Sequence, residues 1–144
     1  HGRDRRQRQM CIRDRLLIDD SKGTNSLNKR LLREMDVAEH ISTALNGRLA
    51  LDYLLSKNEE GNYPSPDIIF LDINMPVMDG YQFLKEFKSL EKEKGLNKII
   101  IMLTTSVREG DMEKTMSYAA VKGYQFKPLT KEKVNVVIEQ VIRS

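Results

Sequence analysis

Three short apolar runs in this 144-residue chain each end abruptly in polar residues. The run at 16–18 leads into Asp19-Asp20, the run at 66–71 into Asp72, and the run at 98–103 into Thr104-Thr105. Continuous apolar runs of this length are typical of strands buried on both faces, as in a parallel sheet. Weaker strands are expected near 37–43 and 123–126, so the sequence predicts a five-stranded parallel sheet.

Segments with helical periodicity lie between these runs. Apolar residues at 27, 31 and 35 recur every four positions, and the first helix is expected to start after a cap at Asn25 or Ser26. Further helices are expected over 50–55 after Gly47, over 83–90, after a cap at Asp111, and over 134–142. Strand and helix alternating five times predicts an α/β fold, namely a doubly wound (βα)5 sandwich.

The positive charge of the chain is concentrated at its start. The chain has a net charge of +3, but residues 1–15 hold six Arg and two acids, which leaves −1 for the rest. Residues 5–14, RRQRQMCIRD, resemble the translation of a sequencing adapter. We therefore expect residues 1–14 to be an unstructured or adapter-derived leader, and residues 15–144 to form one domain. A single Cys and the lack of a secretory signal or a long apolar span favour a cytoplasmic protein with no membrane segment.

The polar ends of the strands are expected to form one site. Ligands of parallel α/β sheets bind at the carboxyl ends of the strands, where Asp19, Asp20 and Asp72 would meet Lys127 and a threonine. Clustered carboxylates repel one another and favour a compensating cation. Because the site offers oxygen donors without a nearby His or Cys, Mg²⁺ or Mn²⁺ is expected rather than Zn²⁺.

Four motifs in order carry a resemblance to a known family. They are Ile18-Asp19-Asp20, then IFLDINMPVMDG at 69–80, then Leu103-Thr104-Thr105-Ser106, then GYQFKP at 123–128. Residues 15–143 thereby resemble the receiver domain of bacterial two-component response regulators, most closely the chemotaxis-type regulators that consist of this domain alone. The resemblance implies that the sandwich is flavodoxin-like.

The resemblance also implies a role for each site residue. Asp72 would be the phosphoacceptor, and the metal would be held by Asp19, Asp20, Asp72 and the backbone carbonyl of Asn74. Lys127 would pair with the phosphoryl oxygens, and Pro128 would set its position through a cis bond.

A threonine and Tyr124 would form the conformational switch. Counting forward from Ile99 favours Thr104 as that threonine, whereas counting back from Tyr124 favours Thr105. Thr104 is the preferred assignment, with Thr105 at the small-residue position after it.

The implied function is signalling by phosphorylation. A sensor histidine kinase or a histidine phosphotransfer protein would donate the phosphoryl group, and an unknown downstream protein would read the changed surface. No output region is expected after the receiver domain, so direct binding to nucleic acid is not expected. The protein would not be an enzyme beyond its own phosphorylation and dephosphorylation.

Two alternatives use the same residues differently. A small Mg²⁺-dependent phosphatase of the haloacid-dehalogenase type also has an aspartate nucleophile at a strand end. It needs a second acid two residues later, and Asn74 stands at that position. A non-phosphorylated receiver-like adaptor would keep the fold and bind a partner constitutively, but the complete set of acids, threonine and lysine argues against it.

Overall fold

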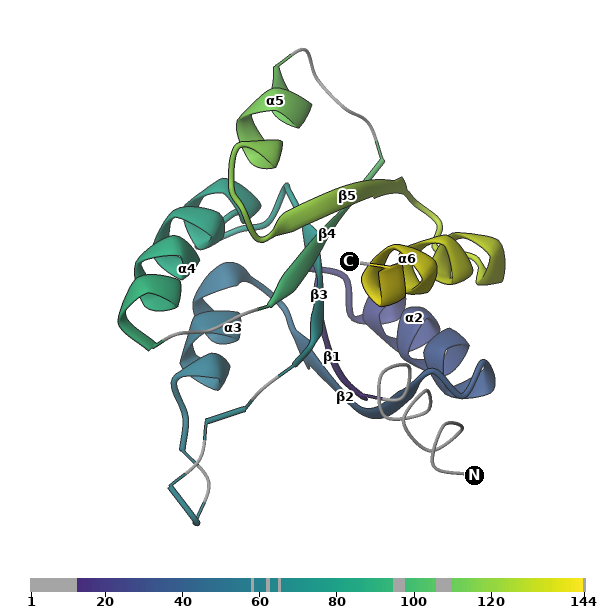
Figure 1. Ribbon diagram of the computed structural model, residues 1–144, viewed down its shortest axis with the longest axis horizontal. Coiled ribbons are helices and arrows are strands. Elements are labelled where there is room, and N and C mark those ends of the chain that lie inside the picture. Colours follow the sequence, from purple (N-terminus) through teal and green to yellow (C-terminus); the bar gives the residue numbers. More distant parts are fainter. Residues whose placement is uncertain are drawn as a thin grey trace.

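A computed structural model describes residues 13–57, 59–61, 63–64, 66–94, 98–105 and 110–143. Strands and helices alternate along this part of the chain (Figure 1). The strands are β1 (Arg13–Ile18), β2 (Ala38–Ala44), β3 (Ile68–Asp72), β4 (Ile99–Thr104) and β5 (Val121–Phe126). The helices are α2 (Lys22–Glu34), α3 (Gly47–Leu54), α4 (Gly80–Lys94), α5 (Asp111–Met116) and α6 (Lys131–Arg143).

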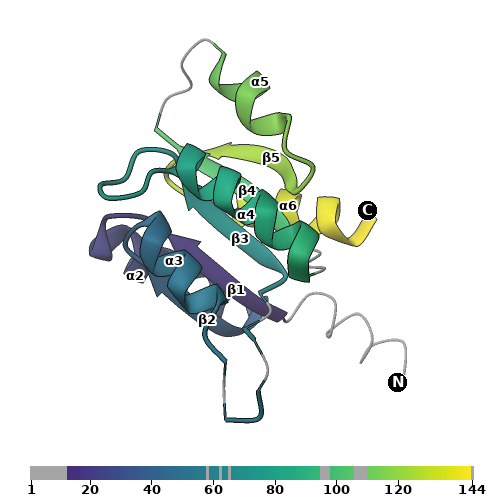
Figure 2. The same ribbon diagram turned by 90° about the vertical axis from the view of Figure 1, so that its left-hand side faces the viewer.

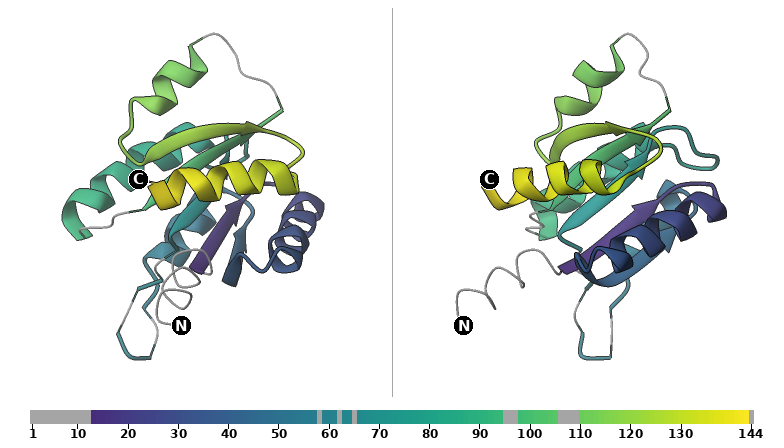
Figure 3. Two further views of the ribbon diagram at one scale, coloured as in Figure 1. Left: turned by 45° about the vertical axis from the view of Figure 1, so that its right-hand side comes forward. Right: turned by 90° about the vertical axis from the view of Figure 1, so that its right-hand side faces the viewer.

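The five strands form one parallel sheet in the order β2-β1-β3-β4-β5. Figure 1 shows α3 and α4 on one face of this sheet and α2 and α6 on the other, and Figures 2 and 3 view these two faces in turn. The arrangement confirms the expected doubly wound (βα)5 sandwich.

Neighbouring residues of each central strand enter different cores, because successive side chains point to opposite faces. Leu16 and Ile18 belong to the cluster that contains Phe83 of α4, whereas Leu17 packs with Leu32 of α2. All five residues of β3 are buried. The central strands are therefore continuously apolar in sequence, because helices cover both faces of the sheet.

The first helix begins earlier than the sequence predicted. Ser21 is the N-cap of α2, and its hydroxyl accepts a hydrogen bond from the Thr24 amide at 3.2 Å. Asn25 lies inside the helix and is buried instead of capping it. The expected cap at Asp111 is also wrong, since α5 starts at Asp111 and its cap is Gly110.

The first strand also extends further than expected. β1 starts at Arg13, and the Asp14 carbonyl accepts a hydrogen bond from the Asp67 amide at 2.9 Å. Residues 13 and 14, which we assigned to the leader, thus pair with the sheet, whereas residues 1–12 lie outside the described residues. Among the helices that the structure describes, none combines the length and apolar character needed to cross a bilayer.

Candidate functional site

Three carboxylates and an ammonium group meet at the carboxyl edge of the sheet. Oxygen atoms of Asp19, Asp20 and Asp72 lie within 4.8 Å of one another. The Lys127 Nζ atom donates to Asp19 Oδ2 at 2.6 Å and lies 3.4 Å from Asp72 Oδ1. The structure thus brings together the four charged residues that the sequence predicted, from the ends of β1, β3 and β5.

Burial and neighbouring charges shift two pKa values in this cluster. Burial raises the pKa of Asp72 above its ordinary value, and the negative charges of Asp19 and Asp20 add to the rise, while Lys127 opposes it. Burial would lower the pKa of Lys127, but its hydrogen bond to Asp19 and the charge of Asp72 raise it overall. Lys127 is therefore a stable cation that offsets the crowded carboxylates.

Backbone and amide groups fix Asp19 in place. Its Oδ1 atom accepts a hydrogen bond from the Ser21 amide at 2.9 Å, and its own amide donates to the Ala44 carbonyl at 3.0 Å. The buried Asn25 amide group donates to the Asp19 carbonyl at 3.0 Å and more weakly to the Ala44 carbonyl at 3.4 Å. Asn25 thus ties the end of β1 to the end of β2.

The loop after Asp72 is held by a close backbone approach. The Gly80 amide donates to the Ile73 carbonyl at 2.8 Å, and a Cβ atom at Gly80 would lie 2.7 Å from the Asp72 carbonyl oxygen. Asp79 and Gln82 cap the start of α4 reciprocally: the side-chain oxygen of each residue accepts a hydrogen bond from the backbone amide of the other. The start of α4 therefore lies directly against the backbone of Asp72.

Hydrogen bonds to the backbone position Lys127. Its amide donates to the Thr104 carbonyl at 2.8 Å, and the Lys127–Pro128 peptide bond is cis, as expected. The Lys133 ammonium group of α6 donates to the carbonyls of Phe126 and Pro128, at 2.7 and 3.0 Å. Both neighbours of Lys127 are thereby tied to the first turn of α6.

The remaining predicted residues lie around this cluster at different depths. Thr104 ends β4 and is buried, whereas Thr105 is exposed beside Lys127 and Pro128. Asn74 is exposed, two residues after Asp72. The arrangement puts both threonines near the lysine, with only Thr104 inside the sheet.

Tyr124 is partly buried on β5 and faces α5. Its hydroxyl is hydrogen-bonded to the hydroxyl of Thr115, which is itself buried and also donates to the Met112 carbonyl at 3.3 Å. Tyr124 therefore connects the strand that leads to Lys127 with the helix α5.

The donor set fits a hard divalent cation. Three carboxylates from two strand ends converge, Asp20 is exposed to solvent, and the described residues place no His or Cys in the cluster. Oxygen donors with room for water are what Mg²⁺ requires. Lys127 would have to share its two carboxylate partners with the cation.

Several supporting residues were missed by reasoning from the sequence. Asn25 was interpreted as a helix cap, and no contact was predicted for Gly80, Lys133 or Thr115. A periodicity argument places Asn25 on the buried side of α2 one turn before Asn28, but nothing local indicates its partners. Their contacts join separate elements, which is why the sequence pattern does not reveal them.

The fold and the site together define an α/β domain of the receiver type, and comparison with known proteins agrees. Residues 16–139 match the family described as "Response regulator receiver domain". Two-component response regulator 24 of Arabidopsis thaliana is 31% identical over 126 residues, covering 88% of this chain and 81% of that protein. Response regulator Rcp1 of Synechocystis is 33% identical over 97 residues, covering 67% of this chain and 65% of the relative.

A solved structure shows the same arrangement. The two-component response regulator from Cytophaga hutchinsonii superposes with a TM-score of 0.79 at 31% identity, covering 92% of this chain and 98% of that one. This chain belongs to the response regulator receiver family. Receiver domains are signalling domains that are phosphorylated by histidine kinases and bind Mg²⁺ at an acidic pocket. The phosphatase and adaptor alternatives are not favoured by these comparisons.

Proposed function

We propose that Asp72 accepts a phosphoryl group from a phosphohistidine of a histidine kinase or a histidine phosphotransfer protein. The observation that carries the proposal is the Lys127 ammonium group, 2.6 Å from Asp19 and 3.4 Å from Asp72, inside a cluster of three carboxylates. A carboxylate at a strand end is a competent nucleophile once neighbouring charges are balanced. Phosphoryl transfer needs positioning and charge neutralisation more than it needs a covalent apparatus.

In the transfer step, an oxygen of the Asp72 carboxylate attacks the phosphorus atom. The P–N bond of the phosphohistidine breaks, and its electron pair stays on the imidazole. Lys127 is placed to move from Asp72 to the phosphoryl oxygens, since it already lies between the two acids. Dephosphorylation is attack by water on the same phosphorus atom, which releases phosphate and restores the carboxylate.

A divalent cation fits this chemistry. Asp19, Asp20, Asp72 and the Asn74 carbonyl would hold Mg²⁺ or Mn²⁺, which would neutralise charge on the phosphoryl oxygens. The backbone contacts of Asp19 with Ser21 and Ala44 keep the first of these acids in place.

Thr104 and Tyr124 are proposed as the switch. Thr104 ends β4 and its carbonyl accepts a hydrogen bond from the Lys127 amide, so we propose that its hydroxyl reaches the region that a phosphoryl group would enter. A threonine drawn toward that group leaves space behind it, and Tyr124 on the neighbouring strand is the ring that can fill it. Such a rearrangement would move α5 through the Thr115–Tyr124 hydrogen bond.

The test is the intact mass of the protein after incubation with acetyl phosphate and Mg²⁺. We expect a gain of about 80 Da, the mass of one phosphoryl group. Asp72→Asn and removal of the cation by a chelator should each abolish the gain. A folded Asp72→Asn protein that is modified at the wild-type rate would overturn the assignment of Asp72.

A groove beside the site fits the phosphodonor. It has a volume of about 530 Å³ and lies between α2 and the loop after β5, with Leu27, Leu31 and Leu129 along it and Thr105 and Lys127 at one side. Leu27 is 68% exposed, and together with Leu31 and Leu129 it gives the groove an apolar side. We propose that an apolar surface of the donor protein covers this groove and thereby brings its phosphohistidine to Asp72.

Leu27→Asp separates donor docking from chemistry. We expect it to slow phosphotransfer from a phosphorylated histidine phosphotransfer protein by about tenfold or more, because an apolar contact of this size is worth 1–2 kcal/mol. The rate with acetyl phosphate should not change. Leu49→Asp, at an exposed leucine of α3, is the matched control and should slow neither reaction. Equal slowing by both variants would contradict the docking assignment.

A further inference from the structure

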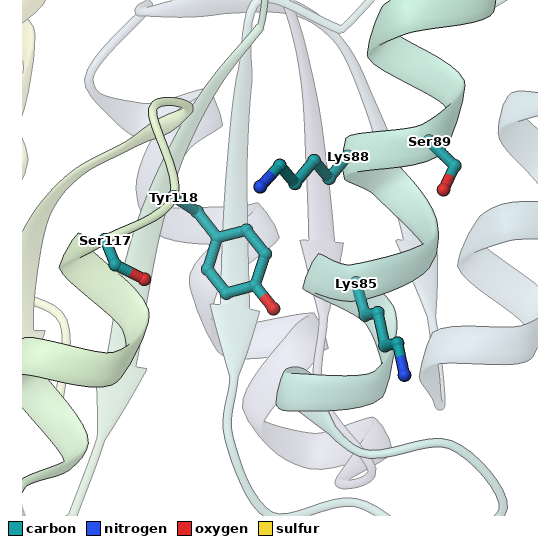
Figure 4. Close-up of a pocket in the computed structure, with 5 residues that line it drawn as sticks. All are labelled: Lys85, Lys88, Ser89, Ser117 and Tyr118. Atoms are coloured by element: carbon teal, nitrogen blue, oxygen red, sulfur yellow. The ribbon is translucent and has the colours of Figure 1, made fainter.

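A second groove lies between α4 and the end of α5, away from the residues of the acidic cluster. It has a volume of about 480 Å³ and is lined by Lys85, Lys88 and Ser89 of α4 and by Ser117 and Tyr118 after α5. Figure 4 shows Lys88 extending from α4 toward the ring of Tyr118 on the opposite wall. None of these five residues has a role in the proposed phosphorylation.

The α4 wall of the groove carries two positive charges. Lys85 and Lys88 are exposed, and neither forms an ion pair with any other residue that the structure describes. Lys114 of α5 lies outside this lining and places its ammonium group 4.2 Å from the ring centre of Tyr81 of α4. Two neighbouring ammonium groups without a carboxylate partner favour an anionic occupant of the groove.

The two walls are joined by contacts that a ligand can replace. Lys88 Nζ lies 5.8 Å from the ring centre of Tyr118, near the outer limit of a cation–π contact. The Ser117 hydroxyl donates its hydrogen bond to the Lys114 carbonyl at 2.7 Å, so it is not a free donor for a ligand. The cations of the groove are thus available, and the Tyr118 ring offers an apolar surface beside them.

The spacing of Lys85 and Lys88 along α4 suits an extended acidic peptide. Residues three apart on a helix have Cβ atoms about 5–6 Å apart. Alternate residues of an extended chain lie about 6.5–7 Å apart on one side of the peptide. Acidic residues at alternate positions can therefore meet Lys85 and Lys88 together, a match that neither a single phosphate ion nor a buried apolar helix would make.

We propose that this groove binds an acidic, extended segment of a partner protein. Carboxylates of the segment pair with Lys85 and Lys88, and a side chain of the segment packs on the ring of Tyr118. A nucleic acid is a poorer fit, because the chain apart from residues 1–15 has a net charge of −1.

The test is an NMR titration of the ¹⁵N-labelled full chain with a blocked ten-residue peptide in which Glu and Ser alternate. It is done without phosphodonor or Mg²⁺, so its outcome is independent of the proposed function. We expect the largest shifts at residues 85–89 and 117–118. A peptide with Gln in place of Glu should bind at least about tenfold more weakly.

Matched variants separate the groove from general charge attraction. Lys85→Glu with Lys88→Glu should weaken peptide binding about tenfold or more. Arg48→Glu with Lys131→Glu makes the same change in net charge at exposed helix starts and should alter it less than about twofold. Thermal unfolding checks that both variants are folded. No binding by the wild type, equal loss in the two variants, or shifts centred elsewhere would each overturn the proposal.

Discussion

Individual residues of this site are constrained by backbone contacts as much as by charge. Gly80 is an example, because its missing side chain lets the start of α4 approach the carbonyls of Asp72 and Ile73. A Cβ atom there would lie within 2.9 Å of the Ile73 Cα atom, and these neighbours are backbone atoms that cannot rotate away. The position of the proposed nucleophile therefore depends on a residue that carries no functional group.

Gly80→Ala is expected to destabilise the protein by about 1–3 kcal/mol, the usual cost of forcing an extra carbon into a packed site. It should also slow phosphorylation by acetyl phosphate, since the backbone of Asp72 must shift. Gly23→Ala is the control, because its new Cβ atom would lie 3.8 Å from its nearest neighbour, within α2. It should be neutral or stabilising by up to about 1 kcal/mol. Urea unfolding measures both, and equal stability of the two variants would contradict this account of Gly80.

Among the elements, α4 and α5 differ in how firmly they are attached. Phe83, Leu84 and Phe87 bury α4 against the sheet, and the two phenylalanine rings stack with centres 5.7 Å apart. By contrast, α5 has six residues and lacks a side-chain cap. Its buried Thr115 links it to Tyr124. We therefore expect α5 to move when Tyr124 moves. The groove between α4 and the end of α5 would then change shape, because residues after α5 form one of its walls.

The far end of α4 supplies a test of pH dependence. Partial burial raises the pKa of the Glu91 carboxyl, although the charge of Lys122 opposes the rise. The folded protein then holds this proton to a higher pH than the unfolded chain does. The protonated Glu91 carboxyl therefore stabilises the fold at low pH. This contribution is lost as the pH rises from the pKa of Glu91 in the unfolded chain through its higher pKa in the folded protein.

The Glu91→Gln variant cannot ionise at this position, so it does not lose stability in this way as the pH rises. Its free energy of unfolding should exceed that of the wild type at pH 7, and the advantage should shrink as the pH falls below the range in which Glu91 ionises. Because the carboxyl is only partly buried, we expect a difference below about 1 kcal/mol. Urea unfolding between pH 4 and pH 8 measures it, and a wild type that is more stable than the variant at pH 7 would refute the burial argument.

At the scale of the whole molecule, the sheet unites residues that are remote in the chain. Lys127 and Asp19 are 108 residues apart, yet they form the shortest ion pair at the site. We propose that the receiver consists of residues 15–144 together with residues 13 and 14, which extend β1. Residues 1–12 would then be dispensable for folding.

Two truncations test this boundary. Deletion of residues 1–12 keeps the pairing of β1 with β2 and β3, and we expect stability to change by less than about 0.5 kcal/mol. Deletion of residues 1–14 also removes the acceptor for the Asp67 amide, and we expect it to cost about 1–2 kcal/mol. Melting temperatures compare the two, and an equal loss in both truncations would place the boundary earlier.

The sequence by itself determined the sheet, its helices and the charged members of the site. Each apolar run and its polar end is a local signal, and parallel connections bring all such ends to one edge. Asp19, Asp20, Asp72 and Lys127 could therefore be assigned before any contact was known.

Only the tertiary structure decided which residues support that site. Asn25 holds two strand ends instead of capping a helix, Lys133 binds the carbonyls on both sides of Lys127, and Thr115 bonds to Tyr124. The same holds for the groove between α4 and α5, whose walls come from separate helices. These contacts depend on how elements pack together, and a periodicity of two or 3.6 residues reports only which face of its own element a side chain occupies.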